Sequence, residues 1–115
     1  MADEVSISLI FVYDKSTKIK RTESFTADVT GESQIHAVQT VDTSEEALTS
    51  HSDIGTPAWC FVKNLDTANF ITIGATGSLN MTLLAGESCV FRTNVALYAQ
   101  ADTAACEVEY IIIEL

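Results

Sequence analysis

Apolar and polar residues alternate strictly near the beginning of the chain. Every second residue from 5 to 13 is large and apolar, and the same period returns in residues 19–29, where the intervening positions are mostly lysine, threonine, serine and aspartate. A period of two residues is typical of a β-strand with one buried face. The pattern therefore predicts an antiparallel hairpin of residues 4–13 and 19–29 around a turn at 14–18. Its apolar face contains Val5, Ile7, Leu9, Phe11, Tyr13, Ile19, Phe25, Ala27 and Val29.

Short strand-like segments separated by turn residues fill the rest of the chain. In the last segment Cys106, Val108, Tyr110 and Ile112 alternate with polar residues, and the end is apolar on both faces, which predicts a central or covered strand. Turn signals recur about every 8–12 residues, a spacing typical of sandwiches and jelly rolls. We expect one all-β domain spanning residues 1–115, an antiparallel, jelly-roll-like β-sandwich of about eight to ten short strands. The other expected strands are 35–41, 58–65, 70–75, 79–84 and 88–92.

Two segments allow more than one interpretation. Residues 42–56 could begin a short helix capped by Ser44, but no apolar helical stripe follows, so an edge strand or an ordered loop is favoured. Residues 95–105 are rich in alanine and could form a helix, yet their alternation favours a strand. Trp59 is expected in the core, and the alternative is an exposed platform for a sugar.

The charge of the chain is strongly negative. Sixteen acids against six bases give a net charge of −10, which argues against nucleic acid as a partner. Four of the bases (Lys15, Lys18, Lys20 and Arg21) gather at the predicted hairpin turn, where they are either solvated or dock on an acidic partner. The sequence shows no membrane span and no signal peptide, so we expect a protein made in the cytoplasm without a membrane partner.

Reactive residues form no recognisable catalytic or metal-binding pattern. Cys60, Cys89 and Cys106 are widely spaced without a CxxC pair, and we expect reduced thiols that pack as small apolar groups. His36 is interpreted as a sheet histidine, and Glu107 and Glu109 as the solvated face of the last strand rather than a cation site. The predicted protein is not an enzyme and has no cofactor, no metal and no small-molecule substrate.

The second half of the chain resembles small single-domain virion proteins of tailed bacteriophages. The resemblance covers residues 58–115 and rests on a strand that ends in Asn64-Leu65-Asp66-Thr67-Ala68-Asn69, the turn Leu83-Leu84-Ala85-Gly86-Glu87, the strand Tyr98-Ala99-Gln100-Ala101 and the closing Glu109-Tyr110-Ile111. It implies a compact, jelly-roll-like sandwich, a structural role as capsid decoration on the outer virion surface, and no active site. Asn64, Asp66, Asn69, Gly86 and Glu87 would shape turns.

A decoration protein binds symmetric copies of itself and the shell. We therefore expect a homo-oligomer, with a trimer favoured, that binds the major capsid protein. Candidate assembly contacts are Ile10, Val12, Ile111, Ile113 and Leu115. The alternatives are a tail, neck or baseplate component and a carbohydrate-binding sandwich. A cupin-like enzyme is disfavoured because the sequence lacks the His and Glu cluster of such metal sites.

Overall fold

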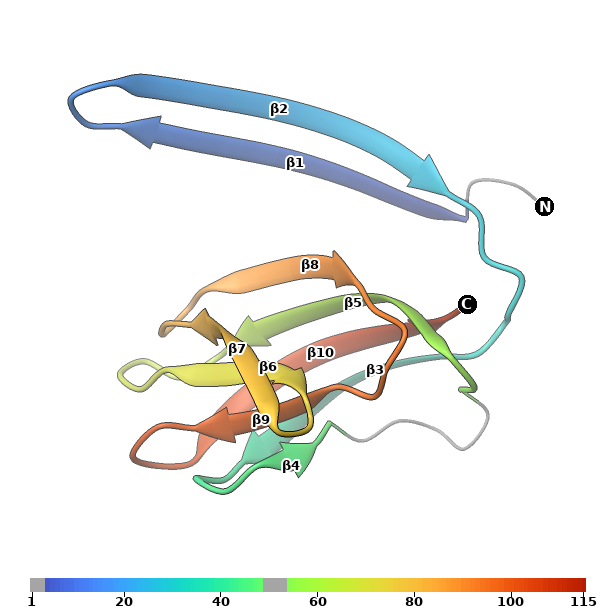
Figure 1. Cartoon of the computed structure of the whole chain (residues 1–115), viewed down its shortest axis with the longest axis vertical. Coiled ribbons are helices and arrows are strands. Elements are labelled where there is room, and N and C mark those ends of the chain that lie inside the picture. Colours follow the sequence, from blue (N-terminus) through green and yellow to red (C-terminus); the bar gives the residue numbers. More distant parts are fainter. Residues whose placement is uncertain (1–3, 49–53) are drawn as a thin grey trace. The chain divides into compact units, whose positions relative to one another are not determined.

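The computed structural model describes residues 4–48 and 54–115, and all regular structure in this part of the chain is β-strand (Figure 1). These residues contain no helix of the length and apolarity needed to cross a membrane. The all-β class predicted from the alternation is thus confirmed. The ten strands in this described part are β1 (Val5–Asp14), β2 (Lys18–Ala27), β3 (Gln34–Val41), β4 (Glu46–Ala47), β5 (Pro57–Asn64), β6 (Ile71–Ala75), β7 (Ser78–Leu83), β8 (Ser88–Arg92), β9 (Tyr98–Ala101) and β10 (Cys106–Glu114).

The chain divides into two compact units, Met1–Thr30 and Gly31–Leu115. The first unit is the hairpin of β1 and β2, whose ten residue pairs run from Val5 opposite Ala27 to Asp14 opposite Lys18. The predicted hairpin is confirmed, with strand ends shifted by one or two residues. The prediction that residues 1–115 form one domain stays a prediction, and the sandwich described next comprises the second unit.

Eight strands of the second unit form two four-stranded antiparallel sheets. One sheet has the order β3-β10-β5-β8 and the other β4-β9-β6-β7. Successive strands cross repeatedly from one sheet to the other, and eight strands divided in this way form a jelly roll. Strand β10 pairs with both β3 and β5, so the apolar last strand is central, as predicted.

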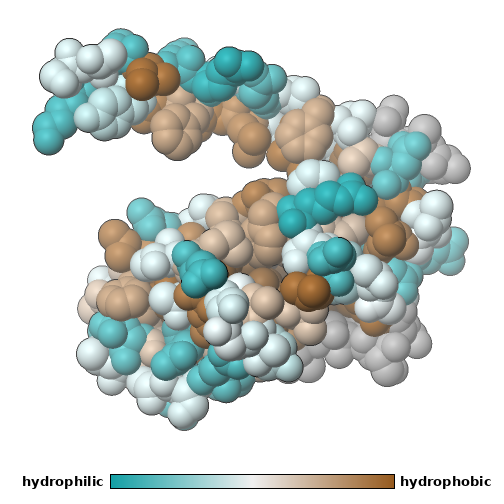
Figure 2. Space-filling view, in the orientation of Figure 1, coloured by the Kyte–Doolittle hydropathy of each residue, from teal (hydrophilic) through white to brown (hydrophobic). Residues whose placement is uncertain are grey.

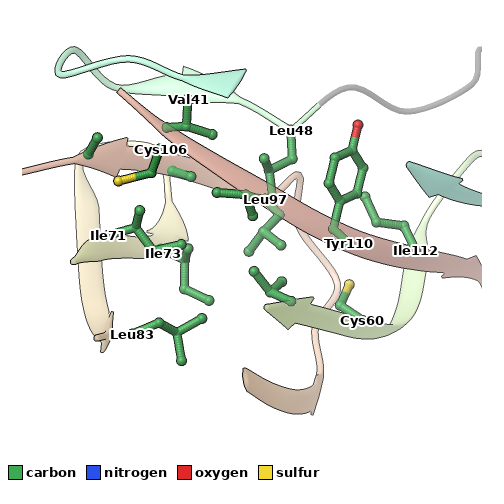
Figure 3. Close-up of a cluster of buried hydrophobic side chains, with 14 of the residues drawn as sticks. Val41, Leu48, Cys60, Ile71, Ile73, Leu83, Leu97, Cys106, Tyr110 and Ile112 are labelled. Atoms are coloured by element: carbon green, nitrogen blue, oxygen red, sulfur yellow. The ribbon is translucent and has the colours of Figure 1, made fainter. Parts of the chain in front are cut away.

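The core lies between the inner faces of the two sheets (Figure 3). Alternate residues of β5 and β10 point inward, as the two-residue period requires, and β6 and β9 contribute from the opposite sheet. Fully burying one large aliphatic side chain stabilises the fold by about 1.5–3 kcal/mol. The buried cluster is Val41, Leu48, Ile54, Cys60, Val62, Ile71, Ile73, Leu83, Leu97, Ala99, Ala101, Cys106, Val108, Tyr110 and Ile112.

The two ambiguous segments are strands over only part of their length. Within 42–48 the structure has the two-residue strand β4, and residues 49–53 of the predicted loop lie outside the described residues. Within 95–105 the strand is restricted to β9, because the residues on either side form bends and irregular structure. The strand interpretation of the second segment was correct in type and too long in extent.

Candidate assembly surfaces

The hairpin has one mainly apolar face and one mixed face. In its antiparallel register, Ile7 lies opposite Phe25 and Tyr13 lies opposite Ile19, and cross-strand partners share a face of the sheet. We call the apolar side the arm face. It consists of Val5, Ile7, Leu9, Phe11, Tyr13, Ile19, Arg21, Glu23, Phe25 and Ala27.

Large apolar side chains of the hairpin are exposed to an unusual degree. Phe11 is 68% exposed, and Ile10, on the opposite face, is 74% exposed. Figure 2 shows apolar surface along the hairpin, with hydrophilic surface at its tip. The described part of this unit contains two strands and no second layer, and an isolated two-stranded hairpin is at best marginally stable in water. An exposed apolar surface of this kind is typical of an interaction site.

The tip of the hairpin is basic. Lys15, Lys18, Lys20 and Arg21 surround the turn, and Lys18 pairs in register with Asp14. The Arg21 side chain donates to Glu23, and because both side chains are exposed this ion pair contributes little to stability. The hairpin thus ends in a basic turn. Of the three bases in β2, Arg21 lies on the arm face, whereas Lys18 and Lys20 lie on the mixed face.

The β3-β10-β5-β8 sheet has a second apolar surface on the side opposite the core. Its register places Ile111 beside His36 and Phe61, and Phe61 beside Val90. The next row toward the end of β10 places Ile113 beside Trp59. We call this side the outer face. Its apolar part contains Trp59, Phe61, Val90, Ile111 and Ile113.

The other part of the outer face is polar and charged. Glu109 lies in register between Val38 on β3 and Lys63 on β5, and Glu107 lies further along the same strand. The Nε2 atom of His36 lies 2.7 Å from an Oε2 atom of Glu109. Glu107 is exposed and Glu109 is half-buried. The outer face therefore changes along β10 from apolar to acidic.

Trp59 lies on the outer face, which corrects the expectation that it belongs to the core. Its neighbours Ala58 and Cys60 point inward and are buried, so the alternation of β5 turns Trp59 outward. The guanidinium carbon of Arg92, the partner of Trp59 in register, lies 5.6 Å from the centre of the indole ring. A cation over an aromatic face at this distance gives a modest cation–π attraction.

The five predicted turn residues meet at one end of the sandwich. The buried Asn64 side chain donates from Nδ2 to the carbonyl oxygens of Asn69 (2.9 Å) and Leu83 (3.1 Å), and its Oδ1 accepts from the Asp66 N–H (3.0 Å). The Asp66 carboxylate accepts from the backbone N–H groups of Ala68 and Asn69, and these bonds lower the pKa of Asp66.

The neighbouring turn at residues 84–87 is hydrogen-bonded to the backbone of Asn64. Gly86 has a φ of 81°, a left-handed conformation that glycine adopts without strain, and its N–H donates to the Asn64 carbonyl. The Glu87 Oε1 atom accepts from the Leu84 N–H at 2.8 Å, and the Glu87 carbonyl accepts from the Asn64 N–H. These residues build the loops and offer no open ligand site.

The end of β10 fixes the start of the jelly roll. The Glu114 carboxylate accepts hydrogen bonds from the backbone N–H groups of Gly55 (2.9 Å) and Ser33 (3.4 Å), which lower the pKa of Glu114. The Leu115 carbonyl accepts from the Gly31 N–H at 3.0 Å. The segment that follows the hairpin is therefore bound to the last strand from Gly31 onward.

A small pocket opens at the edge of the core. Its volume is about 90 Å³, and its described lining includes Leu48, Pro57, Cys60, Leu97 and Ile112. Burial raises the pKa of the Cys60 thiol to about 11, so the thiol stays protonated at neutral pH and is a weak nucleophile. All three cysteines are free. Among residues 4–48 and 54–115, no group of His, Cys, Asp or Glu side chains is arranged to hold a metal ion.

The predicted assembly residues lie on different surfaces. Ile10 and Val12 lie on the mixed face of the hairpin, Ile111 and Ile113 lie half-buried on the outer face, and Leu115 is exposed at the end of β10. Sequence reasoning missed the exposed arm face and the contribution of Trp59, Phe61 and Val90. The available signal was Lys63, which shares its parity with Trp59 and Phe61 and so indicates that they point away from the core.

Comparison of the chain with models of known protein families, with curated proteins and with solved structures gives no significant match.

Proposed function

We propose that this chain is a non-enzymatic structural protein of a tailed-bacteriophage virion, and specifically an oligomeric decoration protein bound to the outer surface of the head. The observation that carries the proposal is the exposed apolar hairpin, which belongs to a chain whose sandwich unit already has its own core. A surface of this kind costs free energy in water until a partner covers it. Assembly is the function that supplies such a partner.

The jelly roll supports this choice of class. Viral capsid domains are among the proteins built on this architecture, and lectins and cupins are others. Fold alone does not determine function. The resemblance of residues 58–115 to small virion proteins favours the viral class, and the expected partners are further copies of the chain, as a trimer, and the major capsid protein.

The acidic body also suits a protein that must remain dispersed before assembly. Residues 31–115 contain eleven of the sixteen acids and two of the six bases. Like charges on free subunits repel one another and keep them soluble. The same charge disfavours a role in coating nucleic acid.

The test is co-sedimentation with expanded, undecorated heads of the phage that encodes this chain. We expect wild-type protein to saturate the heads at a fixed ratio to the major capsid protein. Ile10→Asp with Val12→Asp should reduce binding at least tenfold while the far-ultraviolet circular dichroism stays that of the wild type, because both side chains are exposed. Ser6→Asp with Ser8→Asp, on the same hairpin face, is the matched control. Absence of wild-type binding would contradict the head assignment, and binding to isolated tails or necks would favour the alternative virion position.

The position of Trp59 favours a second candidate, a carbohydrate-binding module. An outward indole beside Phe61 could stack on a sugar ring, and lectins also use jelly rolls. Titration with host-cell polysaccharide should then change the fluorescence of Trp59, the single tryptophan in the chain. Unchanged fluorescence together with head binding would favour decoration.

A further inference from the structure

Each copy of the chain carries two apolar sheet surfaces of similar kind. We propose that the arm face of the hairpin packs on the outer face of the β3-β10-β5-β8 sheet in a second copy of this chain, so that neighbouring copies exchange arms. This inference goes beyond the proposed function, because it concerns the chain alone and requires no capsid. Failure of head binding would therefore leave it standing, and its own failure would leave head binding possible.

The two surfaces agree in dimensions. Strands β1 and β2 have ten residues each, and β10, at the centre of the outer face, has nine. At about 3.3 Å per residue both surfaces are roughly 30 Å long, and a two-stranded hairpin is narrower than a four-stranded sheet. The hairpin can therefore lie along the outer face and cover its central strands. Stacked sheets bury their facing side chains in this way in β-sandwiches.

The order of apolar and charged residues also agrees. On the arm face β1 is apolar from Ile7 to Tyr13, whereas β2 places Glu23 and Arg21 beside these residues. The hairpin ends at a basic turn that contains Lys15 and Lys18. The outer face is apolar at Ile113 and Ile111 and becomes acidic toward Glu109 and Glu107. With the arm laid along β10, its apolar part meets the apolar part of the sheet and its basic tip meets the acidic end.

The charge of the units favours the same partner. The segment 14–21 at the tip carries four bases and one acid, whereas the jelly-roll unit carries a large excess of acids. Opposite charges on the two surfaces steer association and select the orientation. A second copy of this chain supplies an acidic surface beside an apolar one, which an unrelated basic or purely polar partner does not.

The hinge between the units is short, which favours exchange between copies. The Val29 N–H donates to the Glu4 carboxylate at 3.0 Å, at the base of the hairpin, and Gly31 is bonded to Leu115. One residue, Thr30, remains between these two fixed points. Short hinges of this kind promote exchange of an element between copies, and exchange of identical elements is a low-cost route to symmetric oligomers.

The direct test uses a photo-reactive side chain on the arm. The full chain carrying p-benzoylphenylalanine at Phe11 is co-refolded as an equal mixture of unlabelled and fully ¹⁵N-labelled protein, then irradiated and digested. We expect cross-links from residue 11 to peptides containing Phe61, Val90 or Ile111, with about half of them joining one light and one heavy peptide. The same probe at Thr22, on the other face of the hairpin, should give at least fivefold fewer links to these peptides.

Two results would overturn the proposal. Cross-links to the outer face that join only peptides of like isotope would show that the arm covers its own chain. Links to other surfaces, or the absence of links, would show that the outer face is not the arm's partner.

A substitution on the receiving surface gives an independent measurement. Val90→Lys, at an exposed position of the edge strand β8, should weaken self-association at least tenfold by sedimentation analysis. Thr82→Lys, at an exposed position of the edge strand β7 in the other sheet, should leave it unchanged. Equal association of the two variants would also contradict the proposal.

Discussion

Asn64 is the single buried polar residue of the core among the described residues, and its amide connects the loop after β5 with the end of β7. Each hydrogen bond replaces one that water would make, so its net contribution is modest. Removing the Asn64 side chain would nevertheless lower the stability of the fold, because the carbonyl oxygen of the buried Leu83 would lose this hydrogen-bond donor. Asn64 therefore has a structural role in the loops at this end of the sandwich.

We predict that Asn64→Ala lowers the free energy of unfolding by about 2–4 kcal/mol, because three hydrogen bonds disappear and buried carbonyl groups remain unpaired. Urea denaturation followed by Trp59 fluorescence measures the change. Asn80→Ala, at an exposed position of β7, is the control and should stay within about 0.5 kcal/mol of the wild type. A loss for Asn64→Ala no larger than that of the control would contradict the assigned role.

Acid should destabilise the fold through its hydrogen-bonded carboxylates. Backbone N–H donors lower the pKa of Glu114 and Asp66, and the Thr76 hydroxyl followed by the Gly77 N–H lowers that of Glu45. The folded state therefore favours the charged forms. This stabilisation is complete above the ordinary pKa of these groups and is lost as the pH falls through their lower folded values.

We predict that Glu114→Gln is less stable than the wild type at pH 7 and loses less stability than the wild type below pH 4.5, the ordinary pKa of this group. The measurement is the urea midpoint between pH 7 and pH 2.5. Parallel pH profiles for the two proteins would contradict the assigned pKa shift.

At the scale of single residues, burial of Trp59 was the clearest error of sequence reasoning. Tryptophan in an apolar run is usually buried, and β5 has apolar residues on both faces, so Lys63 was the one signal that the face of Trp59 points outward. The small residues Ala58 and Cys60 occupy the core side instead. The hydrogen bonds of Asn64 could not be predicted either, since they join residues 64, 69 and 83 through the fold.

At the scale of elements, the hairpin shows what an alternating pattern does and does not establish. The period of two predicted the strands and their register, because local spacing decides which residues share a face. It also predicted a buried face, whereas Phe11 and Ile10 are exposed. Burial depends on what lies against a sheet, and the sequence of one chain does not contain that information when the partner is another molecule.

Gly31, the residue that follows the hinge, packs closely against Glu114 and Leu115. A Cβ atom at this position would lie 2.6 Å from Glu114 Cγ and 2.7 Å from the Leu115 carbonyl oxygen. At Gly55, in contrast, the nearest atom to an added Cβ is Glu114 Oε2 at 3.5 Å, an ordinary contact. These two glycines approach the same side chain with different clearance, so they form a matched pair.

We predict that Gly31→Ala lowers the free energy of unfolding by about 1–3 kcal/mol, the usual cost of overpacking. Gly55→Ala should change it by less than about 0.5 kcal/mol. Thermal and urea unfolding of both variants provide the comparison. Equal stability of the two variants would show that the segment after the hairpin is not held as described.

Short strands were the elements that sequence reasoning located least well. Strand β4 has two residues and pairs only with β9, so no periodic pattern could reveal it. Strand β9 is limited to four residues, although the alternation of small residues continues into the bends on either side. Both strands exist because their neighbours in the sheet hold them, which is a property of the tertiary structure.

At the scale of the whole molecule, composition and architecture support one interpretation. The apolar content of 47% suffices for a sandwich core, and further apolar side chains remain on the hairpin and the outer face. The net charge of −10 makes free copies repel one another, and the tip of the hairpin carries four of the six bases. Exposed apolar side chains, a net charge that keeps free copies apart and a patch of opposite charge are the three properties expected of a subunit that assembles with further copies of itself.

The class of fold could be predicted because it depends on periodicity and turn spacing along the whole chain. The assembly surfaces could be predicted only in part. Ile111 and Ile113 were recognised because they make β10 apolar on both faces, but the arm face was assigned to the core. Sequence patterns identify the apolar residues, and the structure shows which of them remain exposed to solvent.

The most direct test of the central claim, that this chain functions by self-assembly, is its solution mass by light scattering coupled to size exclusion at neutral pH and moderate salt. We predict a mass of two or more copies of the 12.4 kDa chain, with the trimer expected. A mass of one chain at every concentration up to about 1 mM, a range that includes weak complexes, would contradict the claim.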